Sequence, residues 1–207
     1  MKKNLNITTY CQIKNNIVTL NDAPVFVKDT NLSFAEFSKQ IYKEKSISYP
    51  KFFKMDNLCK LAFLAAEFLL EDKKTTTFDK ENMAIVLSNN SASLDTDRKH
   101  QETINDTENY YPSPAVFVYT LANIAIGEIS IRHKIKGENA FFVSNHFDEK
   151  LLEQYAFSLI ANNKSKHVLC GWVDFDGANY NALMYIVSTE ENNKYTHDFI
   201  KKIHTKN

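Results

Sequence analysis

Short apolar runs alternate with longer amphipathic stretches through most of the chain, which is the pattern of an α/β protein. The first run leads into a hairpin-like turn at Asn15 and Asn16. Later runs are short and continuously apolar, as expected of strands that are buried on both faces. We therefore predict five strands, over Leu5–Tyr10, Met83–Ser88, Ala140–Ser144, His167–Phe175 and Tyr180–Val187.

Two segments have the composition of core helices. Asp56 is a good N-cap for the stretch Leu58–Leu70, which is apolar almost all round and carries only Lys60 and Glu67 as charges. Ala115–Ile131 is rich in small and β-branched residues, and we expect its Gly127 to allow a close contact. More polar helices are predicted over Ser93–Ile104, Phe147–Ala161 and 192–206, and a loop with short helices over 21–55.

The order of these elements predicts one domain, residues 1–207, with a three-layer α/β/α architecture. Helices between successive strands favour a mostly parallel five-stranded sheet, because parallel neighbours need a crossover connection. The turn pair Asp176–Gly177 joins the last two strands directly, which is a hairpin signal. The last strand is therefore expected to be antiparallel.

Composition supports a folded domain and narrows its partners. Hydrophobic residues make up 43% of the chain and Gly and Pro number 4 each, which excludes disordered and low-complexity classes. The 25 Lys and Arg balance the 25 Asp and Glu, and Arg98 and Arg132 are the only arginines, so we expect no nucleic-acid binding. The apolar runs are interrupted before about 18 residues, so we expect no membrane span.

The cysteines indicate a reducing compartment. Cys11, Cys59 and Cys170 are an odd and widely spaced set without a CxxC pair, which predicts neither a disulfide framework nor zinc. With no signal peptide at the N-terminus, this favours a cytoplasmic protein. The apolar surroundings of Cys59 and Cys170 predict packing rather than reactivity, whereas the sequence leaves Cys11 open.

The middle of the chain carries a family resemblance. The block YYPSPAVFVYTLANIAIGEISIRHKIKGENAFFVSN, followed by HVLCGWVDFDG, resembles the N-terminal half of β-ketoacyl synthases of the thiolase-like superfamily. The similarity extends over about residues 50–188. It implies a half of the thiolase-like fold, and the chain is similar to short ketosynthase-like proteins of aryl-polyene or flexirubin-type pathways.

Two departures from the family change the expected function. Counted from Gly137, the position of the family's nucleophilic cysteine falls on His146 or within one residue of it, and its neighbours Ser144 and Asn145 offer no thiol either. The family's C-terminal half, with its pair of histidines, has no counterpart in the 207 residues. We therefore predict no catalytic residue and a non-catalytic association partner in fatty acid or polyketide-type biosynthesis.

The alternative is an enzyme. The chain would then be an acyltransferase or condensing enzyme that a partner chain completes, acting on acyl-ACP or acyl-CoA thioesters, with His146 as a general base. A further hypothesis places an acyl chain in an apolar pocket, for which ordinary core packing is the competing explanation. The pocket candidates are Phe117, Phe141, Phe142 and Phe147.

Two other constellations are weaker. Ser144, His146 and Asp148 are too close in sequence to form a Ser–His–Asp triad, because triads converge from separate segments. His100, His133 and His146 lie in different elements without ligand spacing, so we expect no metal. No motif for a cofactor is present, and none is expected.

The resemblance also implies partners. We expect a homodimer in which Ala140–Ser144 pairs across a two-fold axis, because ketosynthase-like folds use the corresponding strand in this way. A full-length ketosynthase or an acyl carrier protein is the other expected partner. Carrier proteins are acidic, and Lys134, Lys136 and Lys150 flank the strand that leads to His146.

Overall fold

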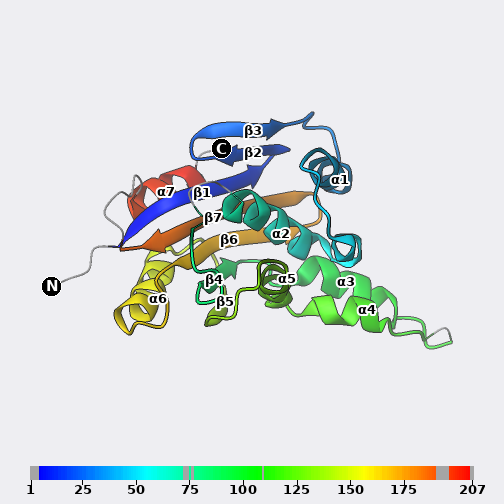
Figure 1. Cartoon of the computed structure of the whole chain (residues 1–207). Helices are drawn as coiled ribbons and strands as arrows, with labels where there is room; N and C mark the ends of the chain where they lie inside the picture. Colours follow the sequence, from blue (N-terminus) through cyan, green and yellow to red (C-terminus); the bar gives the residue numbers. More distant parts are fainter. Residues whose placement is uncertain (1–4, 72–74, 76, 109, 190–195, 206–207) are drawn as a thin grey trace.

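A computed structural model of the chain describes residues 5–71, 75, 77–108, 110–189 and 196–205. Within these residues, seven strands form one mixed sheet in the order β3-β2-β1-β7-β6-β4-β5 (Figure 1). The strands are β1 (Asn6–Lys14), β2 (Ile17–Leu20), β3 (Ala23–Val27), β4 (Ala84–Asn89), β5 (Asn139–Val143), β6 (Val168–Asp176) and β7 (Asn179–Ser188).

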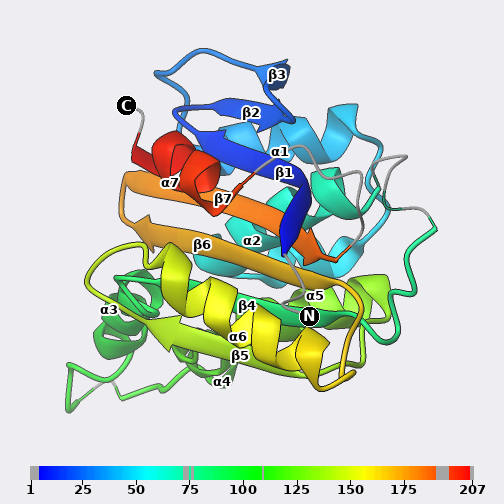
Figure 2. The same ribbon diagram turned by 90° about the vertical axis from the view of Figure 1, so that its left-hand side faces the viewer.

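Helices cover both faces of this sheet. One face carries α1, α2 and α5, and the other carries α6 and α7, which lie in front of the sheet in Figure 2. The short helices η1, α3, α4 and η2 complete the first layer. Their bounds are α1 (Phe34–Glu44), η1 (Pro50–Lys54), α2 (Asn57–Leu70), α3 (Leu94–Glu102), α4 (Pro114–Phe117), η2 (Val118–Thr120), α5 (Ile124–His133), α6 (Glu149–Ala161) and α7 (His197–Thr205).

The central strands are buried on both faces, as their unbroken apolar sequence predicted. In β4, Ile85 and Leu87 pack into the core beneath α2 and α5, whereas Ala84 and Val86 pack into the core beneath α6 and α7. The N-cap at Asp56 is also confirmed, because its Oδ1 accepts a hydrogen bond from the backbone N–H of Cys59 (2.8 Å). The three-layer α/β/α class is therefore confirmed.

The sheet is larger and less parallel than the predicted five strands. Parallel pairing is confined to β4 with its two neighbours β5 and β6 within the described residues, and all other pairings there are antiparallel. The five predicted strands are all present, but β3 falls in the region 21–55 that we expected to be a loop. Its residues are mostly exposed, so the strand has no alternation of buried and exposed positions by which the sequence would reveal it.

Tight hairpins account for three of the four antiparallel pairs, β1–β2, β2–β3 and β6–β7, whereas β1 and β7 are far apart in the sequence. The turn at Asn15–Asn16 is confirmed, and both residues have the positive φ that such two-residue turns require (50° and 58°). The second predicted hairpin lies one residue further on than expected. Asp176 pairs with Asn179, so the turn is Gly177–Ala178, with Gly177 at φ 61°.

The predicted core helix over Ala115–Ile131 is wrong in one respect, because it is broken. Leu121 is extended (φ −108°, ψ 106°) and separates η2 from α5. The hydroxyl of Ser93 donates to the carbonyl of Thr120 (2.6 Å), which satisfies a group that a continuous helix would use. In the described residues no single helix is long and apolar enough to cross a membrane. Counted together, the helical segments Pro114–Thr120 and Ile124–His133 would be long and apolar enough by length and composition alone, but the pair is bent by 98°.

Close backbone contacts lie at other glycines than expected. A Cβ at Gly127 would have no atom within 4 Å, so the predicted close contact there is wrong. A Cβ at Gly137 would lie 2.3 Å from the carbonyl oxygen of Met83, and one at Gly171 would lie 2.8 Å from that of Leu183. Gly137 therefore sets how closely the segment that leads into β5 approaches β4.

Candidate functional site

The loop that follows β5 contains the position at which the resemblance places a nucleophile. The backbone N–H of Ser144 donates to the carbonyl of Asn89 (2.8 Å), so this loop leaves the sheet beside the end of β4. Asn145 and His146 are exposed. Asp148 caps α6, because its Oδ1 accepts from the backbone N–H groups of Lys150 (3.1 Å) and Leu151 (3.0 Å). This cap engages the carboxylate that a Ser–His–Asp arrangement would need.

A cavity of about 490 Å³ lies between this loop and α7. Lys201 and Glu149, which form an ion pair (2.8 Å), both line it. Burial opposes ionisation of Glu149, but the hydrogen bond from Lys201 lowers its pKa. The lining residues described by the structure include no thiol: His146, Phe147, Asp148, Glu149, Lys150, Lys201, His204 and Thr205.

The three cysteines lie in the core. Cys11, Cys59 and Cys170 are all free thiols with at most 2% of their surface exposed. Burial raises the pKa of each, so each remains a protonated thiol at neutral pH. The packing predicted for Cys59 and Cys170 is confirmed, and Cys11 belongs with them. None of them lies on the loop after β5.

The phenylalanines that were pocket candidates are not brought together. Phe141 packs against the core under α2 and α5, whereas Phe142 packs on the opposite face, with its ring 5.5 Å from that of Tyr155. Phe147 is buried near Trp172 (6.1 Å), and Phe117 is 56% exposed on α4. Phe147 and Phe142 alone share a core region.

The sheet ends at β5, whose outer side pairs with no strand among the described residues. β5 follows β4 in uninterrupted parallel register from Asn139 to Val143. The strand has no charged residue and no proline. An edge strand without these protective features is a template for pairing with another chain.

Several elements at the same end of the molecule carry exposed apolar side chains. We call β5 together with these residues the β5 face. The side chains come from β5, α4, η2, α5 and the loop before α4, which lie at one end of the sheet in Figures 1 and 2. They are Tyr110, Tyr111, Phe117, Val118, Leu121, Ile131 and Val143, each between 47% and 76% exposed.

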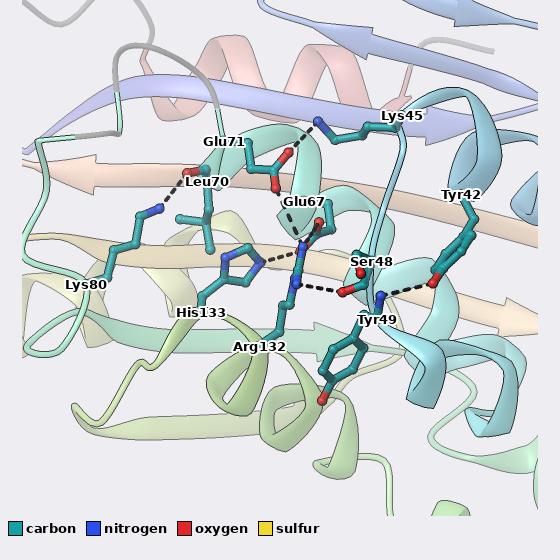
Figure 3. A network of polar contacts seen from close by, with 10 residues as sticks. All are labelled: Tyr42, Lys45, Ser48, Tyr49, Glu67, Leu70, Glu71, Lys80, Arg132 and His133. Atoms are coloured by element: carbon teal, nitrogen blue, oxygen red, sulfur yellow. Dashed lines mark hydrogen bonds and ion pairs between the residues drawn. The ribbon is translucent and has the colours of Figure 1, made fainter.

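A buried ionic network fixes α5, which carries part of this face, to α2 (Figure 3). Glu67 of α2 is fully buried and accepts two hydrogen bonds from Arg132, at 2.7 Å from Nε and 3.0 Å from Nη2. Nε2 of His133 lies 3.0 Å from Glu67 Oε1. Burial would raise the pKa of Glu67, but His133 and Arg132 lower it to about 2.

The same arginine also reaches the segment before η1. Its guanidinium lies over the ring of Tyr49 (5.5 Å) and donates to the carbonyl of Ser48 (3.4 Å), and Glu71 is 3.7 Å away (Figure 3). Sequence reasoning missed this network, because it identified Glu67 only as one of the two charges of the helix and gave it no partner. The sequence did offer a signal: Glu67 is the one acid in an otherwise apolar helix, and the chain has only two arginines that could pair with it.

The lysines expected to guide a carrier protein do not form one patch. Lys134 and Lys136 precede β5, whereas Lys150 follows it at the start of α6, so they lie at opposite ends of the strand. Lys136 also forms an ion pair with Glu81. The described residues contain no group of three His, Cys, Asp or Glu that would hold a metal ion, and His133 belongs to the network around Glu67.

Comparison with known proteins identifies the fold. No protein-family model matches the chain, and no curated protein matches it. Solved structures match over most of its length. They include the ishigamide ketosynthase/chain length factor (TM-score 0.68, 17% identity, 92% of this chain), a ketosynthase (ApeO) in complex with its chain length factor (ApeC) from Xenorhabdus doucetiae (0.58, 16%, 91%), and a β-ketoacyl synthase from Burkholderia phymatum STM815 (0.59, 11%, 92%).

The chain thus has a ketosynthase-like thiolase fold, as the sequence resemblance predicted. It spans 63%, 80% and 60% of the three matched chains, and so less than two thirds of the first and of the third. At these identities the likeness establishes the fold and leaves activity, substrate and partners to be inferred from the site.

Proposed function

We propose that the chain is a non-catalytic partner that docks through the β5 face onto a ketosynthase in fatty acid or polyketide-type biosynthesis. The observation that carries this proposal is the unprotected edge of β5 beside a concentration of exposed apolar side chains. Such a patch at a free sheet edge favours association with another chain. Two of the matched structures combine a ketosynthase with a chain length factor, which supports a ketosynthase as the binding partner.

The chemistry around the loop after β5 supports a non-catalytic role. Carbon–carbon bond formation by a ketosynthase needs an acylated nucleophile. Residues 144–148 contain no cysteine, and the three thiols of the chain are buried and protonated. A cytoplasmic location is part of the proposal and agrees with these unpaired cysteines.

The test compares the two edge strands of the sheet. Val143 on β5 and Val27 on β3 are about equally exposed, at 60% and 57%, so replacing either with lysine leaves the core intact. We expect Val143→Lys to raise the Kd for a ketosynthase of the same organism by at least about tenfold, because a charge would be buried at the strand edge. Val27→Lys is the matched control and should leave the Kd unchanged. Sedimentation of the mixed proteins measures both.

A homodimer through the same edge is the rival outcome. In this outcome the chain forms a dimer that does not bind the ketosynthase and that Val143→Lys converts to a monomer. The β5 face is then the interface between two copies of this chain. That result would overturn the ketosynthase proposal. Equal effects of Val143→Lys and Val27→Lys would show that the β5 face takes part in neither interaction.

An acyl carrier protein is the second partner that we propose. One matched structure, with TM-score 0.65 and 12% identity, is a type II polyketide synthase acyl-carrier protein in complex with its ketosynthase. A chain docked on a ketosynthase would lie close to the carrier that serves it. This partner is tested separately, by titration with a carrier protein at low and raised salt, because a complex between charged surfaces weakens as salt screens them.

One observation favours the enzymatic alternative. His146 borders the cavity of about 490 Å³ beside Glu149 and Lys201, where a general base would have room for a thioester. A thioester-consumption assay with the ketosynthase present separates the two functions. Under the non-catalytic proposal His146→Ala leaves turnover unchanged, and a loss of about 100-fold or more would assign His146 a role in acyl transfer.

A further inference from the structure

Two cavities adjoin at the end of the sheet that carries the β6–β7 turn. One, of about 330 Å³, is lined by residues of β1, of the β6–β7 hairpin and of the C-terminal end of α7. The other, of about 540 Å³, is lined by the same hairpin turn and by the loop that precedes α1. Because Asn15, Ala178 and Tyr180 line both cavities, we treat the two as one site and call it the polar groove.

Two buried polar atoms line the smaller cavity without a hydrogen-bond partner among the residues that the structure describes. They are Oδ1 of Asn181 on β7 and Nε2 of His204 on α7. Buried polar atoms in folded proteins are normally paired with protein, with ordered water or with a ligand, because an unpaired one carries its full desolvation cost. These two atoms therefore indicate a bound group that forms hydrogen bonds.

The imidazole of His204 is held in place as a neutral group. Its ring lies 4.7 Å from the ring of Phe147 and 5.5 Å from that of Trp172. Burial lowers the pKa of His204, and Lys14 lowers it further against the opposing effect of Asp174. A neutral imidazole has one donor and one acceptor nitrogen, whereas Oδ1 of Asn181 only accepts. A hydroxyl group can both donate and accept, so it can pair with either atom.

The charges around the groove favour an uncharged ligand. The described lining of the larger cavity has no charged residue and is rich in amide and hydroxyl groups, such as those of Asn31 and Ser33. The smaller cavity has one charge of each sign, Lys14 and Asp174. Asp174 accepts hydrogen bonds from the backbone N–H of Ser91 (2.8 Å) and from that of the residue before it (3.1 Å). Neither a cation nor an anion is therefore selected.

The walls of the groove are fixed by hydrogen bonds within the chain. Nδ2 of Asn16 donates to the carbonyls of Asp29 (2.7 Å) and Leu32 (2.9 Å), which ties the loop before α1 to the β1–β2 turn. The backbone N–H of Asn16 donates to the hydroxyl of Tyr180 (2.9 Å), whose ring lies 4.9 Å from that of Phe34. A ligand would thus enter a site that is already ordered, which lowers the entropic cost of binding.

We propose that the polar groove binds an uncharged polyhydroxylated small molecule, a sugar or a sugar alcohol. Hydroxyl groups of this ligand pair with Oδ1 of Asn181 and Nε2 of His204, and the amide and hydroxyl groups of the larger cavity bind the remainder. Both cavities are in the size range of small-molecule sites. The groove has no residue in common with the β5 face, so this inference goes beyond the proposed function and does not depend on it.

The experiment titrates the full chain separately with glycerol, D-mannitol and D-glucose. Long-range ¹H–¹⁵N NMR of the imidazoles reports directly on Nε2 of His204. We expect saturable binding of at least one of the three, with a shift at His204 and none at His100. Glucosamine and glucose 6-phosphate are the cationic and anionic counterparts of D-glucose, and each should bind at least about threefold more weakly than the best neutral probe.

Substitutions at the two unpaired atoms test whether they hold the ligand. Asn181→Leu removes Oδ1 while keeping the size of the side chain, and His204→Phe keeps a ring between Phe147 and Trp172. Each should raise the Kd of the best neutral probe about tenfold. Asn162→Leu is the matched control, since Asn162 is exposed and follows the end of α6 away from the groove, and it should leave the Kd unchanged. Thermal unfolding establishes that each variant is folded.

Three results would overturn the inference. Absence of binding by all three neutral probes would mean that the two atoms hold water only. Tighter binding of either charged counterpart would exclude an uncharged ligand. Equal Kd values for the unchanged chain, Asn181→Leu and His204→Phe would place the sugar elsewhere. Val143→Lys should leave probe binding unchanged, so failure of the ketosynthase interaction and failure of the polar groove are read separately.

Discussion

The two edges of the sheet are built differently. The β3 edge contains Pro24, which lacks a backbone N–H, and its hairpin partner β2 has a register irregularity between Val18 and Thr19. β5 has neither a proline nor a register shift. Proline and bulges are features that keep an edge from pairing with other chains. The comparison therefore shows that β3 carries features that protect an edge strand and that β5 lacks them.

The two edges also differ in how they are supported. Beside β3, the pair Lys28–Glu44 is partly exposed to solvent, with side chains 29% and 51% exposed. Behind the β5 face, the carboxylate of Glu67 is fully buried and held by Arg132 and His133. Exposed pairs contribute little to stability, whereas removing one partner of a buried pair leaves an uncompensated charge. We infer that a fixed position of α5 is needed on the β5 side.

The largest expected effect comes from breaking this support. Arg132→Ala leaves Glu67 with a buried charge and should lower the free energy of unfolding by about 3–5 kcal/mol. Lys28→Ala, at the other edge, should cost at most about 1 kcal/mol. Urea unfolding of both variants measures the difference. Equal losses would show that the buried network supports α5 no better than a surface ion pair supports β3.

The network also predicts how stability depends on pH. The pKa of Glu67 is lowered from 4.5 to about 2 in the folded chain, so its stabilisation is present above the unfolded pKa and is lost as pH falls towards 2. The loss should reach about 3 kcal/mol. Glu67→Gln has no titrating group there, and the difference between its unfolding curve and that of the unchanged chain should shrink between pH 5 and pH 2. A difference that is constant with pH would contradict this assignment.

A smaller effect is expected where β5 begins. Gly137→Ala places a Cβ 2.3 Å from the Met83 carbonyl oxygen, and because backbone must move to relieve this contact, we expect a loss of about 1–3 kcal/mol. The displaced segment leads into β5. Backbone amides of β5 should therefore exchange with deuterium faster than in the unchanged chain, whereas exchange in β3 should not change. Unchanged exchange in β5 would show that Gly137 does not control the position of β5 beside β4.

The smallest effect is expected on α5. Gly127 has no atom within 4 Å of an added Cβ and lies inside the helix, so Gly127→Ala should stabilise the chain by about 0.5–1 kcal/mol. It introduces the same methyl group as Gly137→Ala and serves as its control. Thermal unfolding of the two variants should shift in opposite directions, and a destabilised Gly127→Ala would reveal a contact that the fold does not show.

Local sequence determined most of the secondary structure. The cap at Asp56, the apolar run of β4 and the paired asparagines at 15 and 16 act through neighbouring residues, and each is present where it was predicted. The separation of Phe141 from Phe142 also follows from local rules, because consecutive residues of a strand point to opposite faces. That rule alone was sufficient to argue against a shared pocket for these two side chains.

Only the tertiary structure decided which surfaces are available for function. Glu67 and Arg132 are 65 residues apart in the chain, and no periodicity shows that a charge in an apolar helix has a buried partner. The free edge of β5 depends on strand order, which is set by pairings between segments far apart in the chain. The hydrophobic pattern indicates which side of each helix or strand is buried. Long-range packing determines which other element covers that side.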